Sequence, residues 1–230
     1  MKNSVLKDSY KAMPNKGINN SFNGTVLIPD ISGFTKFVNE TEFNAGREIT
    51  KELLSVLINH NNLNLKISEI EGDAILFYIN NYITPLLIKD QFEVMLKHFK
   101  NRLRELREET GLEIDLSLKL IAHYGELSTY RIGKFEKLYG KTVIEAHRLL
   151  KNSIKSSSYI LMTDSIFKAS KDKHVGTCYY SGSQLCEIQG DLKKIGYTYF
   201  DYEEEKDIGN IKSSYELSDY HSRSHFSMVE

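Results

Sequence analysis

The chain has 230 residues, of which 40% are apolar and 27% charged, and its formal net charge is −1. These values predict one packed domain with at most a small appendage. The near-zero net charge gives no general attraction to nucleic acid or lipid, so we expect no DNA, RNA or membrane partner. No apolar run reaches the roughly 20 residues of a membrane span. The two cysteines and the polar N-terminus favour a cytoplasmic location.

The first half of the chain predicts alternating strands and helices. Residues 1–23 are polar and predict a loosely held N-terminal arm, and residues 24–30 predict a strand. Apolar side chains at helical spacing around residues 49–57 predict a helix. Two strands are then expected at 64–71 and 74–79, joined by a tight turn at Glu71-Gly72-Asp73. A long helix is predicted over 86–109, ending at Gly111.

The second half continues in the same manner. Residues 113–122 alternate in polarity and predict a half-buried strand, and a helix follows Gly140. A strand at 157–164, a short helix and closing strands that end in 195–203 complete a domain spanning 24–202, with a loosely held tail over 203–230. This order predicts an α+β fold with a mainly antiparallel sheet and helices on one face.

Two carboxylates fall at corresponding places in this pattern. Asp30 ends the first predicted strand, and Asp73 lies in the predicted hairpin. If the hairpin pairs with the first strand, the two acids meet, and a cation between them relieves their repulsion. Mg²⁺ or Mn²⁺ suits such a site, together with phosphate oxygens of a substrate. The alternative is that Asp30 caps a helix and Asp73 is only a turn residue.

Four stretches resemble motifs of one known family. "DISGFTKF" at 30–37 and "EGDAILFY" at 71–78 resemble the metal-binding motifs of the class III adenylate and guanylate cyclase catalytic domain. "YGKTVIEAHRLL" at 139–150 resembles its third motif, and "LKKIGYTYF" at 192–200 resembles its closing strand. The matches occur in family order across 24–202, and a divergent bacterial cyclase-like family of unknown function is the most similar subgroup.

The resemblance implies a fold and an assembly. We expect a ferredoxin-like βαββαβ domain that forms a head-to-tail homodimer, with each active site shared between two chains. Two Mg²⁺ or Mn²⁺ ions per site would be held by Asp30, Asp73 and the backbone of Ile31. A nucleoside triphosphate would be the substrate, and its ribose 3′-hydroxyl would attack the α-phosphorus and expel pyrophosphate.

The resemblance also implies roles for residues outside the metal site. The amides of Gly33, Phe34 and Thr35 would contact the phosphates at a helix start. Arg148 would stabilise the transition state from the partner chain. Lys193 would hold the triphosphate, with Lys194 as the alternative.

The sequence departs from the family pattern at three positions. Ile144 stands where the family has a ribose-orienting Asn, and loss of such a group typically costs about 10²–10³ in rate. Glu69 and Lys137 occupy the base-contacting positions with charges opposite to those of adenylate cyclases. A carboxylate beside an ammonium matches guanine, and also uracil, better than adenine. The alternative is that Glu69 and Lys137 pair with each other across the dimer and contact no base.

Histidine residues give no separate indication of a site. His123 on a predicted strand is interpreted as structural, and His147 as a surface or interface residue. The sequence therefore predicts a nucleotidyl cyclase that makes a 3′,5′-cyclic mononucleotide, with GTP favoured and ATP or UTP possible. The alternative, favoured by Ile144, is a degenerate cyclase fold that binds a nucleotide or a partner without turnover.

Overall fold

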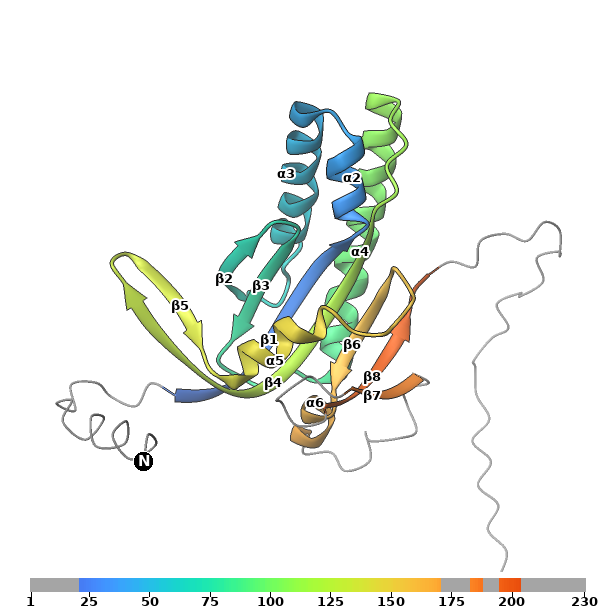
Figure 1. Ribbon diagram of the computed structural model, residues 1–230. Coiled ribbons are helices and arrows are strands. Elements are labelled where there is room, and N and C mark those ends of the chain that lie inside the picture. Colours follow the sequence, from blue (N-terminus) through green and yellow to red (C-terminus); the bar gives the residue numbers. More distant parts are fainter. Residues whose placement is uncertain (1–20, 171–182, 188–194, 204–230) are drawn as a thin grey trace, which may run out of the picture.

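The computed structural model describes residues 21–170, 183–187 and 195–203 (Figure 1). The predicted closing lysines, Lys193 and Lys194, the arm up to residue 20 and the tail beyond residue 203 lie outside these ranges. In chain order the helices and strands are β1 (Ser21–Ser32), α2 (Phe34–Glu40), α3 (Phe43–Asn59), β2 (Lys66–Glu71), β3 (Ala74–Ile79), α4 (Pro85–Thr110), β4 (Ser117–Ile132), β5 (Phe135–Tyr139), α5 (Lys141–Leu149), β6 (Tyr159–Thr163), α6 (Asp164–Ala169), β7 (Ser183–Glu187) and β8 (Ile195–Asp201).

The strands form one sheet in the order β2-β3-β1-β4-β6-β8-β7, and β5 pairs with the far end of β4. The pairs among β2, β3, β1 and β4 are antiparallel, and β4 and β6 are parallel. With α3 after β1 and α4 after β3, the first four strands have the ferredoxin-like βαββαβ order. The predicted α+β class with a mainly antiparallel sheet is confirmed.

The long helix α4 illustrates why the sequence forms these elements. Pro85 occupies its first turn, where the missing N–H is not needed, and the Thr84 side chain accepts a hydrogen bond from Leu87 N–H. The helix ends at Gly111, whose φ of 66° is readily adopted by glycine. The predicted range of 86–109 is therefore confirmed to within one residue at each end.

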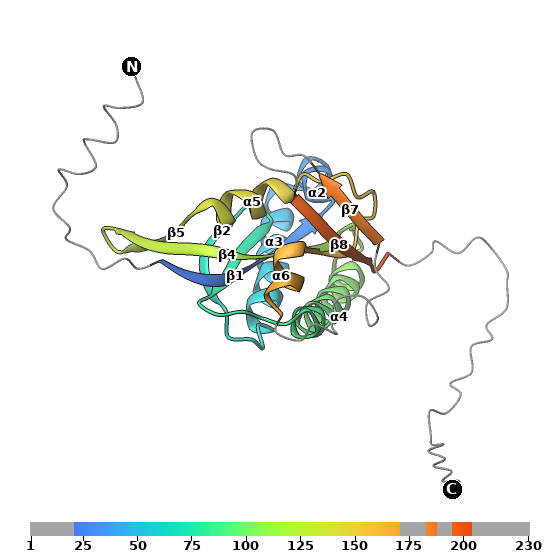
Figure 2. The same cartoon turned by 90° about the horizontal axis from the view of Figure 1, so that it is seen from below.

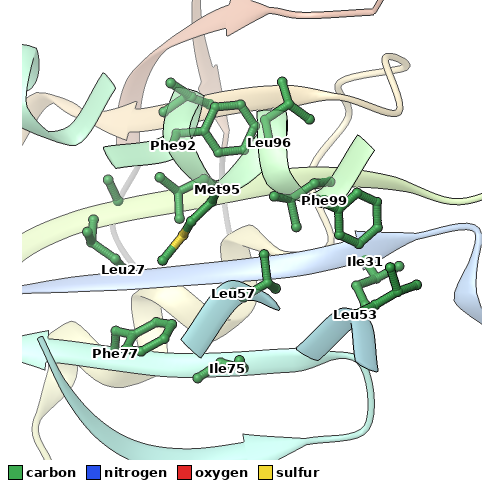
Figure 3. Close-up of a cluster of buried hydrophobic side chains, with 14 of the residues drawn as sticks. Leu27, Ile31, Leu53, Leu57, Ile75, Phe77, Phe92, Met95, Leu96 and Phe99 are labelled. Carbon is green, nitrogen blue, oxygen red and sulfur yellow. The ribbon is translucent and has the colours of Figure 1, made fainter. Parts of the chain in front are cut away.

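Two apolar clusters lie on opposite faces of the sheet. The larger cluster packs α3 and α4 against one face; its members include Leu27, Ile31, Leu53, Leu57, Ile75, Phe77, Phe92, Met95, Leu96 and Phe99 (Figure 3). The second cluster packs α5, through Ala146 and Leu149, on the other face. Figure 2 shows α4 and α5 on opposite sides of the sheet. The prediction that all helices cover one face is therefore wrong, because alternate residues of the central strands are apolar on both faces.

Two strands differ in their bounds from the prediction. β1 runs from Ser21 to Ser32, so it begins inside the predicted arm and continues past Asp30 instead of ending there. β4 begins at Ser117 and continues to Ile132, beyond the predicted 113–122. Its second half forms a hairpin with β5 that projects away from the rest of the sheet (Figure 1).

Candidate functional site

Asp30 and Asp73 come together because the β2–β3 hairpin lies against β1. The antiparallel register pairs Asp30 with Ala74, and Ile31 N–H donates to the Asp73 carbonyl oxygen at 3.2 Å. Gly72 has a φ of 60° in the turn between β2 and β3, a conformation typical of glycine. The hairpin therefore places the three predicted metal ligands, Asp30, Ile31 and Asp73, at one position on the sheet.

The two carboxylates interact electrostatically. Asp30 is buried, and Asp73 is half-buried. Burial raises the pKa of Asp73, and the negative charge of Asp30 raises it further. The described residues contain no cluster of three or more His, Cys, Asp or Glu side chains that could hold a metal ion. A pair of carboxylates is nevertheless the donor set from which proteins commonly bind Mg²⁺ with a phosphate ligand.

Lys119 joins this site and was missed by the sequence analysis. It pairs with Asp30 in the β1–β4 ladder, and its Nζ lies 2.8 Å from Asp30 Oδ2. Burial alone would lower the pKa of Lys119, but the Asp30 carboxylate outweighs this effect and the pKa is raised. The available signal was a lysine inside the alternating apolar stretch "LSLKLIA", on the face opposite Leu118 and Leu120.

The segment that follows β1 has the predicted turn. Gly33 has a φ of 86°, and a Cβ there would lie 2.6 Å from the Asp115 carbonyl oxygen, so the position requires glycine. Phe34 and Thr35 open α2, in which Phe37 N–H donates to Gly33 O at 3.1 Å. The structure places Gly33, Phe34 and Thr35 directly after the strand that carries Asp30; their contact with phosphate stays a prediction.

Glu69 and Lys137 form an ion pair within one chain. Glu69 lies on β2 and Lys137 on β5, and the Lys137 ammonium donates to Glu69 Oε2. This hydrogen bond raises the pKa of Lys137. His147 of α5 approaches the other oxygen of Glu69, with Nε2 at 3.8 Å from Oε1. The pairing that the sequence analysis considered across a dimer thus occurs inside the chain, next to α5.

Helix α5 carries the third motif and exposes two of its side chains to solvent. Arg148 is exposed, and Ile144, one turn earlier, is 51% exposed. The carbonyl oxygen of Leu150, the C-cap of α5, accepts a hydrogen bond from Lys119 Nζ at 3.4 Å. The C-terminal end of α5 therefore lies beside the Asp30–Lys119 pair.

The arrangement matches a class of known structures. The adenylyl cyclase CyaB from P. aeruginosa aligns with a TM-score of 0.59 at 19% identity, covering 82% of this chain and 98% of the other. The guanylyl cyclase Cya2 gives 0.57 at 14% identity, covering 81% and 96%. The guanylate cyclase domain of RhGC from Catenaria anguillulae, solved in complex with GTP, gives 0.52 at 17% identity, covering 79% and 98%. The chain therefore has the fold of class III adenylyl and guanylyl cyclase catalytic domains.

Sequence comparison places the chain beside proteins without an assigned activity. Residues 50–159 match a family described as "Protein of unknown function (DUF2652)". A stretch of 107 residues is 31% identical to "Uncharacterized protein Rv2561/Rv2562" of Mycobacterium tuberculosis. This match covers 44% of the chain and 50% of that protein, so the chain spans about half of the length of the curated relative it matches.

None of the helices in the described ranges combines the length and the apolar composition that a bilayer span requires.

Proposed function

We propose that the chain is a metal-dependent nucleotidyl cyclase that converts a nucleoside triphosphate to a 3′,5′-cyclic mononucleotide and pyrophosphate. GTP is the favoured substrate, and ATP and UTP are the alternatives. The observation that carries the proposal is the juxtaposition of Asp30 on β1 and Asp73 in the adjoining β2–β3 turn of a cyclase fold. In the reaction the 3′-oxygen bonds to the α-phosphorus, and the bond from that phosphorus to the β-phosphate oxygen breaks.

The donor set at β1 and β3 fits the proposed metal. Two adjacent carboxylates favour a cation between them, and the pKa of Asp73 is raised by its burial and further by the charge of Asp30. Asp30, Asp73 and the backbone of Ile31 would hold Mg²⁺ or Mn²⁺, two ions per site, and the bound metal would neutralise phosphate charge and polarise the α-phosphate. The Lys119 ammonium, 2.8 Å from Asp30, is a further positive charge that can interact with a phosphate of the substrate.

The pair of Glu69 and Lys137 supports the preference for GTP. The carboxylate and the ammonium lie side by side, which matches the N–H donors and the O6 acceptor of guanine. Uracil presents the same polarity in a smaller ring. His147 lies against the same carboxylate and adds a group that a base would meet there.

The exposed side chains support a homodimer with shared sites. Arg148 faces solvent, although the proposed reaction needs its charge at the phosphates. Large apolar side chains are also exposed on and near the β4–β5 hairpin: Tyr130, Ile132, Phe135, Tyr139 and Ile144. The rings of Tyr130 and Tyr139 lie 6.4 Å apart, and exposed apolar side chains that gather in this way mark an interaction site. We propose that a second copy covers it head-to-tail and that Arg148 enters the partner's site.

The test is incubation with each of the four nucleoside triphosphates and Mn²⁺, with the product identified by mass. A cyclic mononucleotide formed by the wild type and lost in Asp30→Asn supports the proposal. Absence of product with all four substrates, together with nucleotide binding measured by calorimetry, would instead support the degenerate fold that Ile144 favours.

A further inference from the structure

A second polar cluster surrounds His123, away from the Asp30–Asp73 pair. His123 lies on β4 and is only 5% exposed. Its Nε2 lies 3.0 Å from Glu145 Oε2 of α5, and Glu145 Oε1 is 2.9 Å from Lys141 Nζ, one turn earlier in the same helix. Partial burial would raise the pKa of Glu145, but hydrogen bonds from Lys141 and His123 outweigh it and lower the pKa. Glu145 is therefore an ionised acceptor, and His123 Nε2 must carry the hydrogen.

Two hydroxyls lie on the other side of the imidazole. Burial lowers the pKa of His123 and favours the neutral ring, in which Nδ1 accepts. Thr163 Oγ1 at 2.8 Å and Ser165 Oγ at 3.3 Å are its two donors. The two hydroxyls also lie 2.9 Å apart, where either can donate to the other, and Ser165 Oγ accepts from Tyr124 N–H at 3.3 Å.

The polar cluster around His123 occupies a break in the sheet. β6 pairs with β4 through Ala122, and β5 pairs with it from Ser128 onward. In the part of the chain that the structure describes, no strand pairs with this edge of β4 between those points. The starts of α5 and α6 fill the break: Thr142 Oγ1 donates to Glu126 O at 2.7 Å, and Ser165 belongs to α6. The N-terminal half of α5 is thus tied to the sheet through polar contacts, whereas its C-terminal half packs on the apolar cluster.

Protonation of His123 would rearrange these hydrogen bonds. Nδ1–H would become a donor, so Thr163 would have to accept from it and donate to Ser165. Ser165, which already accepts from Tyr124 N–H, would then have to turn its hydrogen toward the adjoining cavity of about 920 Å³, which Ser165 and Glu145 help to line. The charged groups acting on His123 are Glu145 and Lys141 of α5. From β6 and α6 the hydroxyls of Thr163 and Ser165 contact it, and its neighbour on β1 is the apolar Val26.

We propose that His123 is a positioning residue of the candidate active site. Its neutral Nε2–H form fixes the N-terminal half of α5 on the sheet, and α5 carries Arg148. This inference rests on the proposed cyclase function, because it assigns His123 an effect on that site. The expected consequence is that acid pH lowers kcat through α5 while KM for the nucleotide is retained.

The test uses substitutions at the two hydroxyls. Thr163→Ser keeps the donor and is the conservative control, whereas the double variant Thr163→Val/Ser165→Ala removes both donors from Nδ1. The Thr163 side chain makes no capping hydrogen bond to α6, so the valine removes no such bond from that helix start. We expect a roughly 10- to 100-fold lower kcat in the double variant with little change in KM, because small displacements of catalytic groups have effects of this size.

The pH dependence separates a positioning role from a general loss of stability. Removing both donors destabilises neutral His123, so its pKa rises and the acid limb of the kcat profile moves to higher pH. Thr163→Ser should retain the wild-type profile. Long-range ¹H–¹⁵N spectra, assigned with a His123→Gln variant, should show the proton on Nε2, and the amide resonances of α5 should move as His123 titrates.

Three results would overturn the inference: a proton on Nδ1 in the wild type, α5 amides that do not follow the titration, or identical profiles for the double variant and Thr163→Ser. The wild type could instead make no product from any nucleotide and still show the Nε2 proton and the coupled α5 titration. That result would refute the cyclase proposal and leave the attachment of α5 to the sheet through His123 established.

Discussion

Replacement of Lys119 by methionine should destabilise the protein and strengthen metal binding at the same time. The Lys119 and Asp30 side chains are 18% and 12% exposed and 2.8 Å apart. Loss of one partner of a buried ion pair typically costs about 3–5 kcal/mol. Because both groups retain some solvent contact, we expect about 3 kcal/mol, or a decrease in Tm of roughly 6–12 °C for a domain of this size.

The same substitution removes a cation that competes with the metal. In Lys119→Met, Asp30 and Asp73 repel each other without the neighbouring ammonium. A divalent ion bound only by the native state stabilises it according to its affinity. We therefore expect Mn²⁺ to bind about tenfold more tightly in the variant and to restore much of the lost stability.

The assay is denaturant unfolding with and without Mn²⁺, in the absence of nucleotide. Lys89→Met is a matched control, since Lys89 Nζ lies 2.7 Å from Glu93 in a more exposed pair on α4, with side chains 35% and 42% exposed, and its loss should cost at most about 1 kcal/mol. If Lys119→Met showed the same Mn²⁺ response as the wild type and as Asp30→Asn, the metal would not bind at Asp30 and the reasoning would fail.

Three further predictions follow from the proposed sites. Arg148→Ala should lower kcat about 10²–10³-fold, and mixing it with Asp30→Asn should restore part of the activity if sites are shared between chains. The exchange Glu69→Lys with Lys137→Asp should move the ratio of dissociation constants toward ATP by about one to two decades, measured with Ca²⁺; equal ratios would show that the pair contacts no base. Burial lowers the pKa of His123 below its ordinary value of 6.5, so the native state favours the neutral form and unfolding free energy should decrease as pH falls below 6.5, less so in His123→Gln.

Local patterns in the sequence were sufficient for most of the elements around the site. The predicted strand at 74–79 coincides with β3, because a continuous apolar run between a glycine turn and a polar segment has few other solutions. The turn at Gly72 also followed from the sequence, whereas the pairing of the β2–β3 hairpin with β1 was an assumption that the structure bears out. The proximity of Asp30 and Asp73 could thus be anticipated from short-range features together with one assumption about strand order.

Contacts that depend on long-range register could not be anticipated in the same way. Lys119 faces Asp30 only because β4 pairs with β1 in one particular register, and a shift of one residue would place it on the other face. The position of α5 on the opposite face similarly depends on β4 continuing to Ile132 before the chain turns back through β5. The partnership of Glu145 with His123 follows from that placement.

The two candidate subsites share a property that bears on how a nucleotide would bind. The Asp30 carboxylate is paired with Lys119, and the Glu69 carboxylate is paired with Lys137. At each of these two subsites a ligand must therefore replace an internal ion pair with its own contacts. The net free energy of binding is then smaller than the ligand contacts alone suggest. A metal ion without phosphates, or a nucleoside without a metal, replaces only one of the two pairs. We therefore expect a metal–nucleoside triphosphate complex to bind more tightly than its separate parts predict, because it alone can supply both replacements in one event.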